Sequence, residues 1–210
     1  MAARNIQEVP DVIRAKSFEV IGSNGTLVAG MASTPNGGTC FVTNKNGRLT
    51  TYIKSRTDGG GVIHVCDSAG TPTAKLFASP NGGVLGISNK QGNPVAGMVA
   101  TPTGGGFSVH DEKGIRKVVI AAYPDGGRLD IRNKDGMEVA GIFGNLDGGG
   151  SIGISNDGGV VVSKISAQAF GGLLNVCNKD GNIVAALMAT PDGRGVISTL
   201  NKEGKRGAHI

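Results

Sequence analysis

The stretch NKDGNIVAALMATPDG, Asn178 to Gly193, decides the fold, because nearly the same text, NKQGNPVAGMVATPTG, stands at Asn89 to Gly104. Self-similarity at a fixed period indicates a repeat architecture. Aligned on a four-residue turn that ends in Gly, the text recurs nine times at spacings of 22 or 23 residues. These turns, called Asn-type turns below, begin at Gly22, Asn44, Asp67, Asn89, Asp111, Asn133, Asn156, Asn178 and Asn201.

A second set of turns lies between the Asn-type turns, so that each repeat reads strand, turn, strand, turn. Asn or Asp at the first position can bond its own backbone, and Gly suits a left-handed position at the end of the turn. We therefore expect both sets to be type I turns with a Gly bulge, which close antiparallel hairpins. The second set comprises TPNGG from Thr34, RTDGG from Arg56, SPNGG from Ser79, TPTGG from Thr101, YPDGG from Tyr123, NLDGG from Asn145, AFGG from Ala169 and TPDGR from Thr190.

Side-chain alternation gives the predicted strands one apolar and one mostly polar face. Apolar residues stand two and four positions before each Asn-type turn, as in Leu174 and Val176. After the turn glycine, the fourth, sixth and eighth residues are apolar or small, as in Ala185, Leu187 and Ala189. Successive side chains of a strand point to opposite faces. If residues equally distant from the turn pair, both strands of a hairpin place these residues on the same face. The other face then carries His64, Ser88, Asp130, Arg132, Asn175, Lys54, Lys75 and Lys164.

The fold class predicted is all-β: tandem hairpins of 22–23 residues in a long antiparallel meander with one apolar face. A β-solenoid with stacked parallel repeats is an alternative, followed by a β-propeller. Tight hairpin turns speak against the solenoid. An apolar face of this length needs a cover. The chain can curl on itself, or identical chains can bury their apolar faces together, for example as a triangular prism of three sheets.

The text VIRAKSFEVIGSNGTLVAGMASTPNGG, Val12 to Gly38, resembles the opening of a loosely defined set of bacterial repeat proteins with units of the form FEVxDxDGKxVAxMxxxxDGG. Similar units span Leu129 to Gly149 and Leu173 to Gly193. The resemblance covers almost the whole chain and rests on turn and strand patterning. It implies no catalytic residue. The unit is similar to MORN and RHS repeats in size and hairpin logic only, which implies scaffolding or binding.

Composition argues against an enzyme. The chain has 37 glycines, no tryptophan and 4% aromatic residues, which is unlike an enzyme core filled with bulky side chains. The glycines have no collagen period and fit ordered turns instead. The net charge of +5 arises largely from basic residues near the ends. Nucleic-acid-binding proteins show a denser basic stripe with aromatics, so we expect no nucleic-acid partner.

The side chains that carry chemistry do not form a site in the sequence. His64, His110 and His209 stand in different repeats and are expected to be solvent-exposed. Asn133 with Asp135, and Asn178 with Asp180, fit turn formation, because the spacing of a calcium loop is absent. No phosphate-binding glycine motif occurs. The three cysteines, Cys40, Cys66 and Cys177, fit neither a disulfide scaffold nor a metal site. We therefore predict no catalytic, cofactor-binding or metal-binding residue and no cofactor.

The prediction for function is a non-enzymatic structural or self-assembly protein: a rod, fibre shaft or filament subunit. A protein- or glycan-binding module that uses the polar face is the alternative. We expect a homo-oligomer and no membrane span. A protein or glycan partner is left open. Residues 1–16 are expected to cap or dock the array, and residues 17–210 to form a single repeat-array domain. Without a signal peptide the expected location is the cytoplasm, with an exported particle or virion left open.

Overall fold

The computed structural model describes residues 14–144, 148–202 and 204–209, which divide between two compact units, residues 1–72 and 73–210. All regular structure in the described residues is β-strand. The first unit holds β1 (Ser17–Ile21), β2 (Leu27–Thr34), β3 (Gly37–Thr43), β4 (Leu49–Ser55) and β5 (Gly61–Cys66). From the boundary onward follow β6 (Pro72–Ser79), β7 (Gly82–Ser88), β8 (Pro94–Thr101), β9 (Gly104–His110), β10 (Arg116–Tyr123), β11 (Gly126–Arg132), β12 (Glu138–Gly144), β13 (Gly150–Ser155), β14 (Val161–Gln168), β15 (Gly171–Cys177), β16 (Ile183–Ala189), β17 (Gly195–Leu200) and β18 (Arg206–His209).

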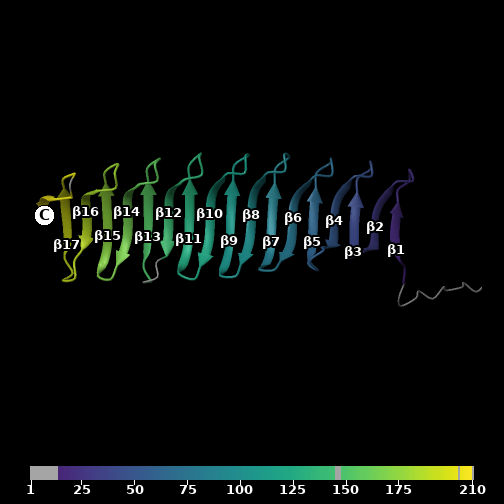
Figure 1. The fold of residues 1–210 in the computed structure, drawn as a ribbon, viewed down its shortest axis with the longest axis horizontal. Helices are drawn as coiled ribbons and strands as arrows, with labels where there is room; N and C mark the ends of the chain where they lie inside the picture. The colour runs from purple at the N-terminus through teal and green to yellow at the C-terminus, as the bar shows by residue number, and fades with distance from the viewer. Residues whose placement is uncertain (1–13, 145–147, 203, 210) are drawn as a thin grey trace, which may run out of the picture. The chain divides into compact units, whose positions relative to one another are not determined.

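Within each unit the strands form an antiparallel meander, which confirms the predicted fold class. β1 to β5 pair in chain order, and so do β6 to β18. The hairpin turns of each unit line two opposite edges of its sheet (Figure 1). A solenoid would stack its repeats in parallel, and a propeller would close blades around an axis. Neither arrangement occurs within the two units.

The Asn-type turns have the predicted geometry. In the turn at Asn178, the Gly181 N–H donates to the Asn178 carbonyl at 3.0 Å, and the Asn178 N–H donates to the Asn182 carbonyl at 2.8 Å. Gly181 has a φ of 86°, in the left-handed region. The same pair of hydrogen bonds closes all nine Asn-type turns. This is a type I turn followed by a Gly bulge.

The second set of turns departs from the prediction, because it takes two forms. The turns at Arg56 and Thr190 have the predicted hydrogen bonds and a left-handed glycine. In the turns at Thr34, Ser79, Thr101, Tyr123 and Ala169 two residues connect the paired ends of the strands, as between Thr34 and its partner Gly37, which has a φ of 121°. The turn at Asn145 lies partly outside the described residues. The Thr34 hydroxyl donates to the Gly37 carbonyl at 2.8 Å and bridges this shorter turn. Such side-chain hydrogen bonds to the local backbone stabilise turns that the main chain does not close alone.

The pairing register is shifted from the predicted one by two residues. Equal distance from the turn places Val176 opposite Ile183, whereas Val176 lies opposite Ala185. Part of the shift comes from the Gly bulge of the turn, and the rest from a second bulge at Val184. Each bulge adds one residue and so reverses which side chains of the strand point to the apolar face. Because two bulges reverse the pattern twice, the predicted faces are preserved. The sequence gives no warning of this bulge, since Val is an ordinary strand residue.

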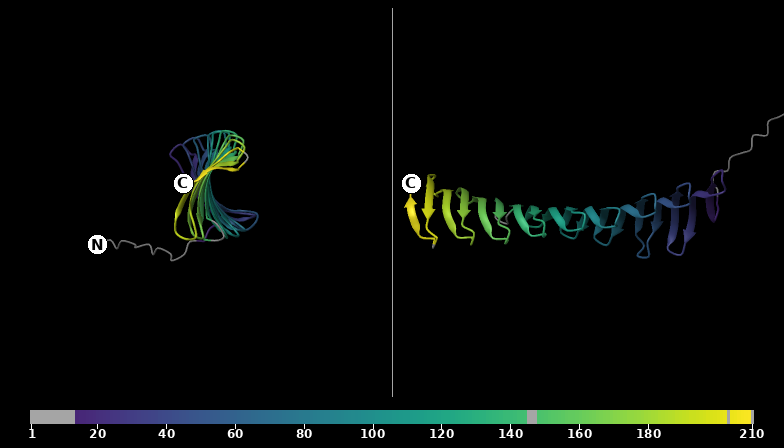
Figure 2. Two further views of the ribbon diagram at one scale, coloured as in Figure 1. Left: turned by 90° about the vertical axis from the view of Figure 1, so that its left-hand side faces the viewer. Right: turned by 90° about the horizontal axis from the view of Figure 1, so that it is seen from above.

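Each unit is a single layer. A strand of the described residues contacts only the strands before and after it in the chain. Successive strands of the second unit rotate steadily against one another (Figure 2), as expected for twisted strands with recurrent bulges. The two faces of each sheet therefore have no other element of the same unit above them, and their own side chains decide what is buried.

Three predictions at the level of the whole chain have different outcomes. The capping or docking segment, residues 1–16, falls largely outside the described residues and stays a prediction. So does the assignment of residues 17–210 to one domain, since the two units are described separately. Among the described residues there is no helix of the length and hydrophobicity needed to cross a bilayer.

Candidate interaction surface

The apolar face of the second unit is built from three parallel rows of side chains, which run across the strands. The central row consists of large side chains only, and cross-strand pairing links each member to the next, as in Leu85 with Met98 and Ile142 with Ile152. Such pairs are the unit of sheet stabilisation. The central row contains Leu76, Leu85, Met98, Phe107, Ile120, Leu129, Ile142, Ile152, Ile165, Leu174, Leu187 and Ile197.

A second row on the apolar face, here called the small row, contains only glycine and alanine. It lies two residues along each strand from the central row, toward the edge of the second turn set. The small row contains Ala78, Gly83, Ala100, Gly105, Ala122, Gly127, Gly144, Gly150, Ala167, Gly172, Ala189 and Gly195. The third row, near the Asn-type turns, mixes alanine or serine with Val, Ile and Thr. The side chains of the apolar face are thus short along the edge of the second turn set and long along the middle of the sheet.

The central row is largely in contact with solvent. Met98 is 54% exposed, Ile165 52% and Ile197 52%. In the first unit the corresponding residues Met31 and Ile53 are 56% and 50% exposed. Single apolar residues on a surface are normal, but a continuous row across successive strands marks an interaction site. The predicted apolar face is confirmed, and none of the described residues of its own unit covers it.

Hollows lie between the central row and the small row in both units. In the second unit a hollow of about 600 Å³ is lined by Leu76, Met98 and Ile120 on one side and by Gly83 and Ala122 on the other. In the first unit a hollow of about 310 Å³ occupies the equivalent place, lined by Met31 and Ile53 together with Gly38, Ser55 and Gly61. The same relief therefore recurs in two separate parts of the repeat array.

The polar face, in contrast, is filled by the chain itself. Every buried residue among those described lies on it, including Val119, Asp130 and Ala186. Long side chains lie flat across the strands and occupy the space above glycines. A Cβ at Gly30 would lie 2.6 Å from the Phe41 ring, and a Cβ at Gly141 would collide with the Phe143 ring. These glycines are required by contacts within the chain.

A charged cluster completes the polar face in the second unit. The Asp130 carboxylate, 3% exposed as a residue, accepts a hydrogen bond of 2.5 Å from Arg128 Nε and lies 3.7 Å from Arg132 Nη2. Arg128 also donates to Glu138, and its guanidinium carbon lies 4.9 Å from the centre of the Phe143 ring. The hydrogen bond to Asp130 raises the pKa of the Arg128 guanidinium. Arg128, Asp130 and Glu138 thus pair with one another, as a buried charge requires, while Arg132 Nε is buried without a hydrogen-bond partner among the described residues.

The histidines are not the freely exposed side chains that the sequence suggests. His64 is half-buried, and its Nδ1 lies 2.6 Å from the Tyr52 hydroxyl oxygen. His110 is half-buried too; burial and the Arg116 charge lower its pKa, and the Asp111 charge opposes them in part. Neither side chain gathers an acid and a nucleophile about it in the described residues. The side chain of His209 lies outside the described set.

The cysteines are free thiols in different environments. Cys40 belongs to the central row of the first unit, between Met31 and Ile53. Cys177 is partly exposed, whereas Cys66 is buried on the polar face. Burial, with the nearby Asp67 charge, raises the pKa of the Cys66 thiol, which makes its reactive thiolate scarcer.

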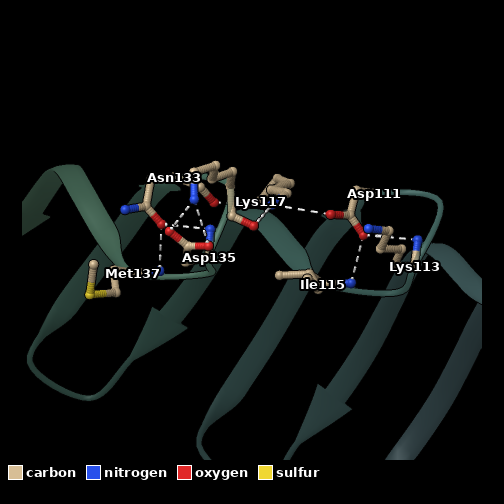
Figure 3. Close-up of polar contacts among 8 residues, drawn as sticks. Asp111, Lys113, Ile115, Lys117, Asn133, Asp135 and Met137 are labelled. Carbon is tan, nitrogen blue, oxygen red and sulfur yellow. Dashed lines mark hydrogen bonds and ion pairs between the residues drawn. The ribbon is translucent and has the colours of Figure 1, made fainter. Parts of the chain in front are cut away.

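The Asn-type turns are linked into a ladder along their edge of the sheet. The first-position Asn or Asp side chain, as in Asn89, accepts from two N–H groups of its own turn. In Asn44, Asn89 and Asn156 the Nδ2 group also donates to a carbonyl of the next turn. Asn89 donates in this way to Glu112 at 3.0 Å, and Asn156 to Lys179 at 3.0 Å. Asp111 has no such donor. Instead Lys117, the bulge residue, lies 3.1 Å from the Asp111 carboxylate and donates to the Asn133 and Lys134 carbonyls (Figure 3).

Several polar and charged side chains of the turns have partners within their own turn. Asn133 Oδ1 accepts from the Asp135 and Met137 N–H groups, which confirms that it forms the turn (Figure 3). Lys134 pairs with Asp135 at 2.9 Å, and Lys179 with Asp180 at 2.7 Å. No group of three or more His, Cys, Asp or Glu side chains suited to a metal occurs in the part of the chain that the structure describes.

Comparison with known proteins assigns no family to the chain, so the repeat pattern is its firmest description. No protein-family model matches the sequence, and no curated protein matches it. The tandem β-hairpin architecture is shown by the strand pairing. The resemblance to bacterial repeat proteins stands on the quoted units alone.

Proposed function

We propose that this chain is a non-enzymatic structural protein that assembles with identical copies through its apolar face, as the subunit of a rod, fibre shaft or filament. The observation that carries the proposal is the continuous central row, half-exposed across successive strands in both units. Water-exposed apolar surface is costly at roughly 25 cal/mol per Å². A surface of this extent is stabilised when copies of the chain bury it against one another.

The accessible area of the chain supports this proposal. A folded monomeric protein of 21.2 kDa exposes about 9,000 Å², whereas this chain exposes 14,343 Å². The difference is larger than the roughly 1,000 to 2,500 Å² that each partner contributes to an obligate interface of about 2,000 to 5,000 Å² in total.

A protein- or glycan-binding module on the polar face is the second candidate. Aromatic and charged groups do meet there, at Tyr52 with His64 and at Arg128 with Phe143. Hollows of about 170 and 210 Å³ lie on this face, however, below the roughly 300 to 1,000 Å³ of typical ligand sites. The side chains of Arg128, Asp130 and Glu138 also pair with one another. The apolar face therefore supports the assembly function better, and the cytoplasm or an exported particle remains the proposed setting.

The test is a charge placed on the central row. Ile142, 49% exposed, is replaced by Asp, and the mass in solution is measured by light scattering behind a sizing column. Assembly would bury an unpaired carboxylate, so we expect self-association to be lost and a mass near 21.2 kDa. The matched control is Lys164→Asp on the polar face, which should keep the wild-type mass. Retention of the wild-type mass by the Ile142→Asp variant, with an unchanged β spectrum, would refute the proposal.

A further inference from the structure

The small row contains glycines that nothing within the chain requires. A Cβ built at Gly83, Gly127, Gly172 or Gly195 meets no atom within 4 Å. None of the four has a positive φ that would exclude a side chain. Glycine weakens a strand, because it brings no side chain to pack and loses more backbone freedom on folding. A strand glycine often marks a bulge, a tight bend, or a close approach by a ligand or another backbone. The four glycines are regularly paired without a bulge, which favours the close approach.

Many other glycines of the chain have an internal reason, although Gly86 on the polar face also stands in open space. Gly181 adopts a left-handed φ of 86°, and a Cβ at Gly141 would collide with Phe143. The turns need only one glycine each, yet seven of the eight turns of the second set contain GG. The first glycine serves the turn, as Gly82 does with a φ of 123°. The second glycine, Gly83, faces open space on the apolar side.

We infer that the small row is a docking groove, and that its occupant is the central row of a second copy of this chain. The groove and the row that would fill it stand on the same face and repeat at the same period of 22–23 residues. They remain in register along a whole array when two copies of equal length meet. The groove is apolar, and the hollow of about 600 Å³ beside it accepts side chains of the size of Leu, Ile and Met.

The solvent-accessible area of the chain supports the same occupant, a second copy of the chain. The uncovered area in excess of a folded monomer is larger than the area that one partner contributes to an obligate interface. A short peptide or small ligand would fill one hollow and leave the rest of the central row in water. This inference rests on the proposed function and specifies which rows meet: large side chains of one copy enter the strip of glycine and alanine on another.

The test fills the groove without adding charge. The triple variant Gly83→Val, Gly127→Val, Gly172→Val is compared with Gly86→Val in the full chain. Gly86 is the matched control, because it lies on β7 beside Gly83 but on the polar face, and a Cβ there also meets nothing within 4 Å. Valine suits a strand, so both variants should keep the β spectrum. Mass in solution is measured for each by light scattering across a dilution series.

We expect the triple variant to associate more weakly by on the order of 100-fold or more, since overfilled interfaces lose packing. The Gly86→Val variant should keep the wild-type mass. Should the triple variant lose its β spectrum, the single variant Gly127→Val takes its place in the same comparison. If the wild-type protein assembles and the filled groove assembles equally well, the inference is overturned while the proposed function stands. A wild-type monomer at every concentration overturns both.

Discussion

The two faces of the sheet share one backbone and differ in whether side chains of the chain itself fill the space above it. On the polar face the chain fills its own space: Phe143 covers Gly141, and Arg128 lies over Phe143. On the apolar face upright Leu, Ile and Met side chains stand beside glycines with nothing above them. A face with many apolar residues therefore need not be the buried one. Burial here follows from side chains that lie flat, and the apolar face stays largely exposed to solvent within each unit.

The largest effect on the stability of the chain is expected from the polar face. Replacing Asp130 by Ala leaves the Arg128 and Arg132 guanidinium groups without their shared carboxylate. Because Asp130 is buried and Arg128 is 37% exposed, the cost should lie between those of buried and surface pairs, at about 2 kcal/mol. Urea unfolding at matched protein concentration measures it. A loss as small as that of a surface pair would show that the polar face is not held by this cluster.

A smaller effect is expected from glycines whose surroundings differ. Gly141→Val meets the Phe143 ring, which must move, and should destabilise the chain by about 1 kcal/mol. Gly127→Val meets nothing within the chain, so the stability of the single chain should be unchanged or slightly raised. Thermal unfolding at low protein concentration compares the two. Equal losses at both sites would erase the distinction between the faces.

The smallest effect is expected at the edge, from the link between Asp111 and Lys117. Burial opposes ionisation of Asp111, but hydrogen bonds from the Ile115 N–H, from Lys117 and from the Lys113 N–H outweigh it and lower the pKa of the carboxyl group. A carboxyl group with a lowered pKa stabilises the fold above its unfolded pKa of about 4, and this contribution is lost as the pH falls through the folded pKa. The link should therefore weaken only in acid.

The variant Lys117→Met tests this edge link. It should be slightly less stable than the wild type at pH 7, and the difference should narrow below about pH 4. The hydrogen bonds from Lys117 to the Asn133 and Lys134 carbonyls do not depend on Asp111 and leave a residual difference. Urea midpoints for both proteins at several pH values provide the measurement. A difference that grew in acid would contradict the assignment.

The residue types in the turns and the alternation of apolar and polar residues along the strands were sufficient to predict the meander and its two faces from the sequence. The Asn-type turns, with Asn178 and Gly181 in fixed places, set the period, and Leu174 with Leu187 identified the apolar side. The bulge at Val184 was not predictable, because it depends on pairing with the neighbouring strand and not on the identity of the residue. Nor could the sequence show that Cys66 is buried, since that depends on how neighbouring side chains lie.

The interaction surface was predictable in part. The small residues after each turn are visible in the sequence as the second glycine of GG and as alanines such as Ala100 and Ala189. Their meaning was not visible, since a glycine in the sequence does not reveal whether a contact within the chain excludes a side chain. The open space around Gly83 and the crowded space around Gly141 separate the two cases.

The most direct test of the central claim is the absolute mass of the purified wild-type chain in solution, measured by light scattering over a wide range of concentrations. We predict a discrete multiple of 21.2 kDa, or a species that grows along one axis in electron micrographs of the same fractions. A monomer of 21.2 kDa at every concentration would contradict the claim that copies of the chain cover one another's apolar faces.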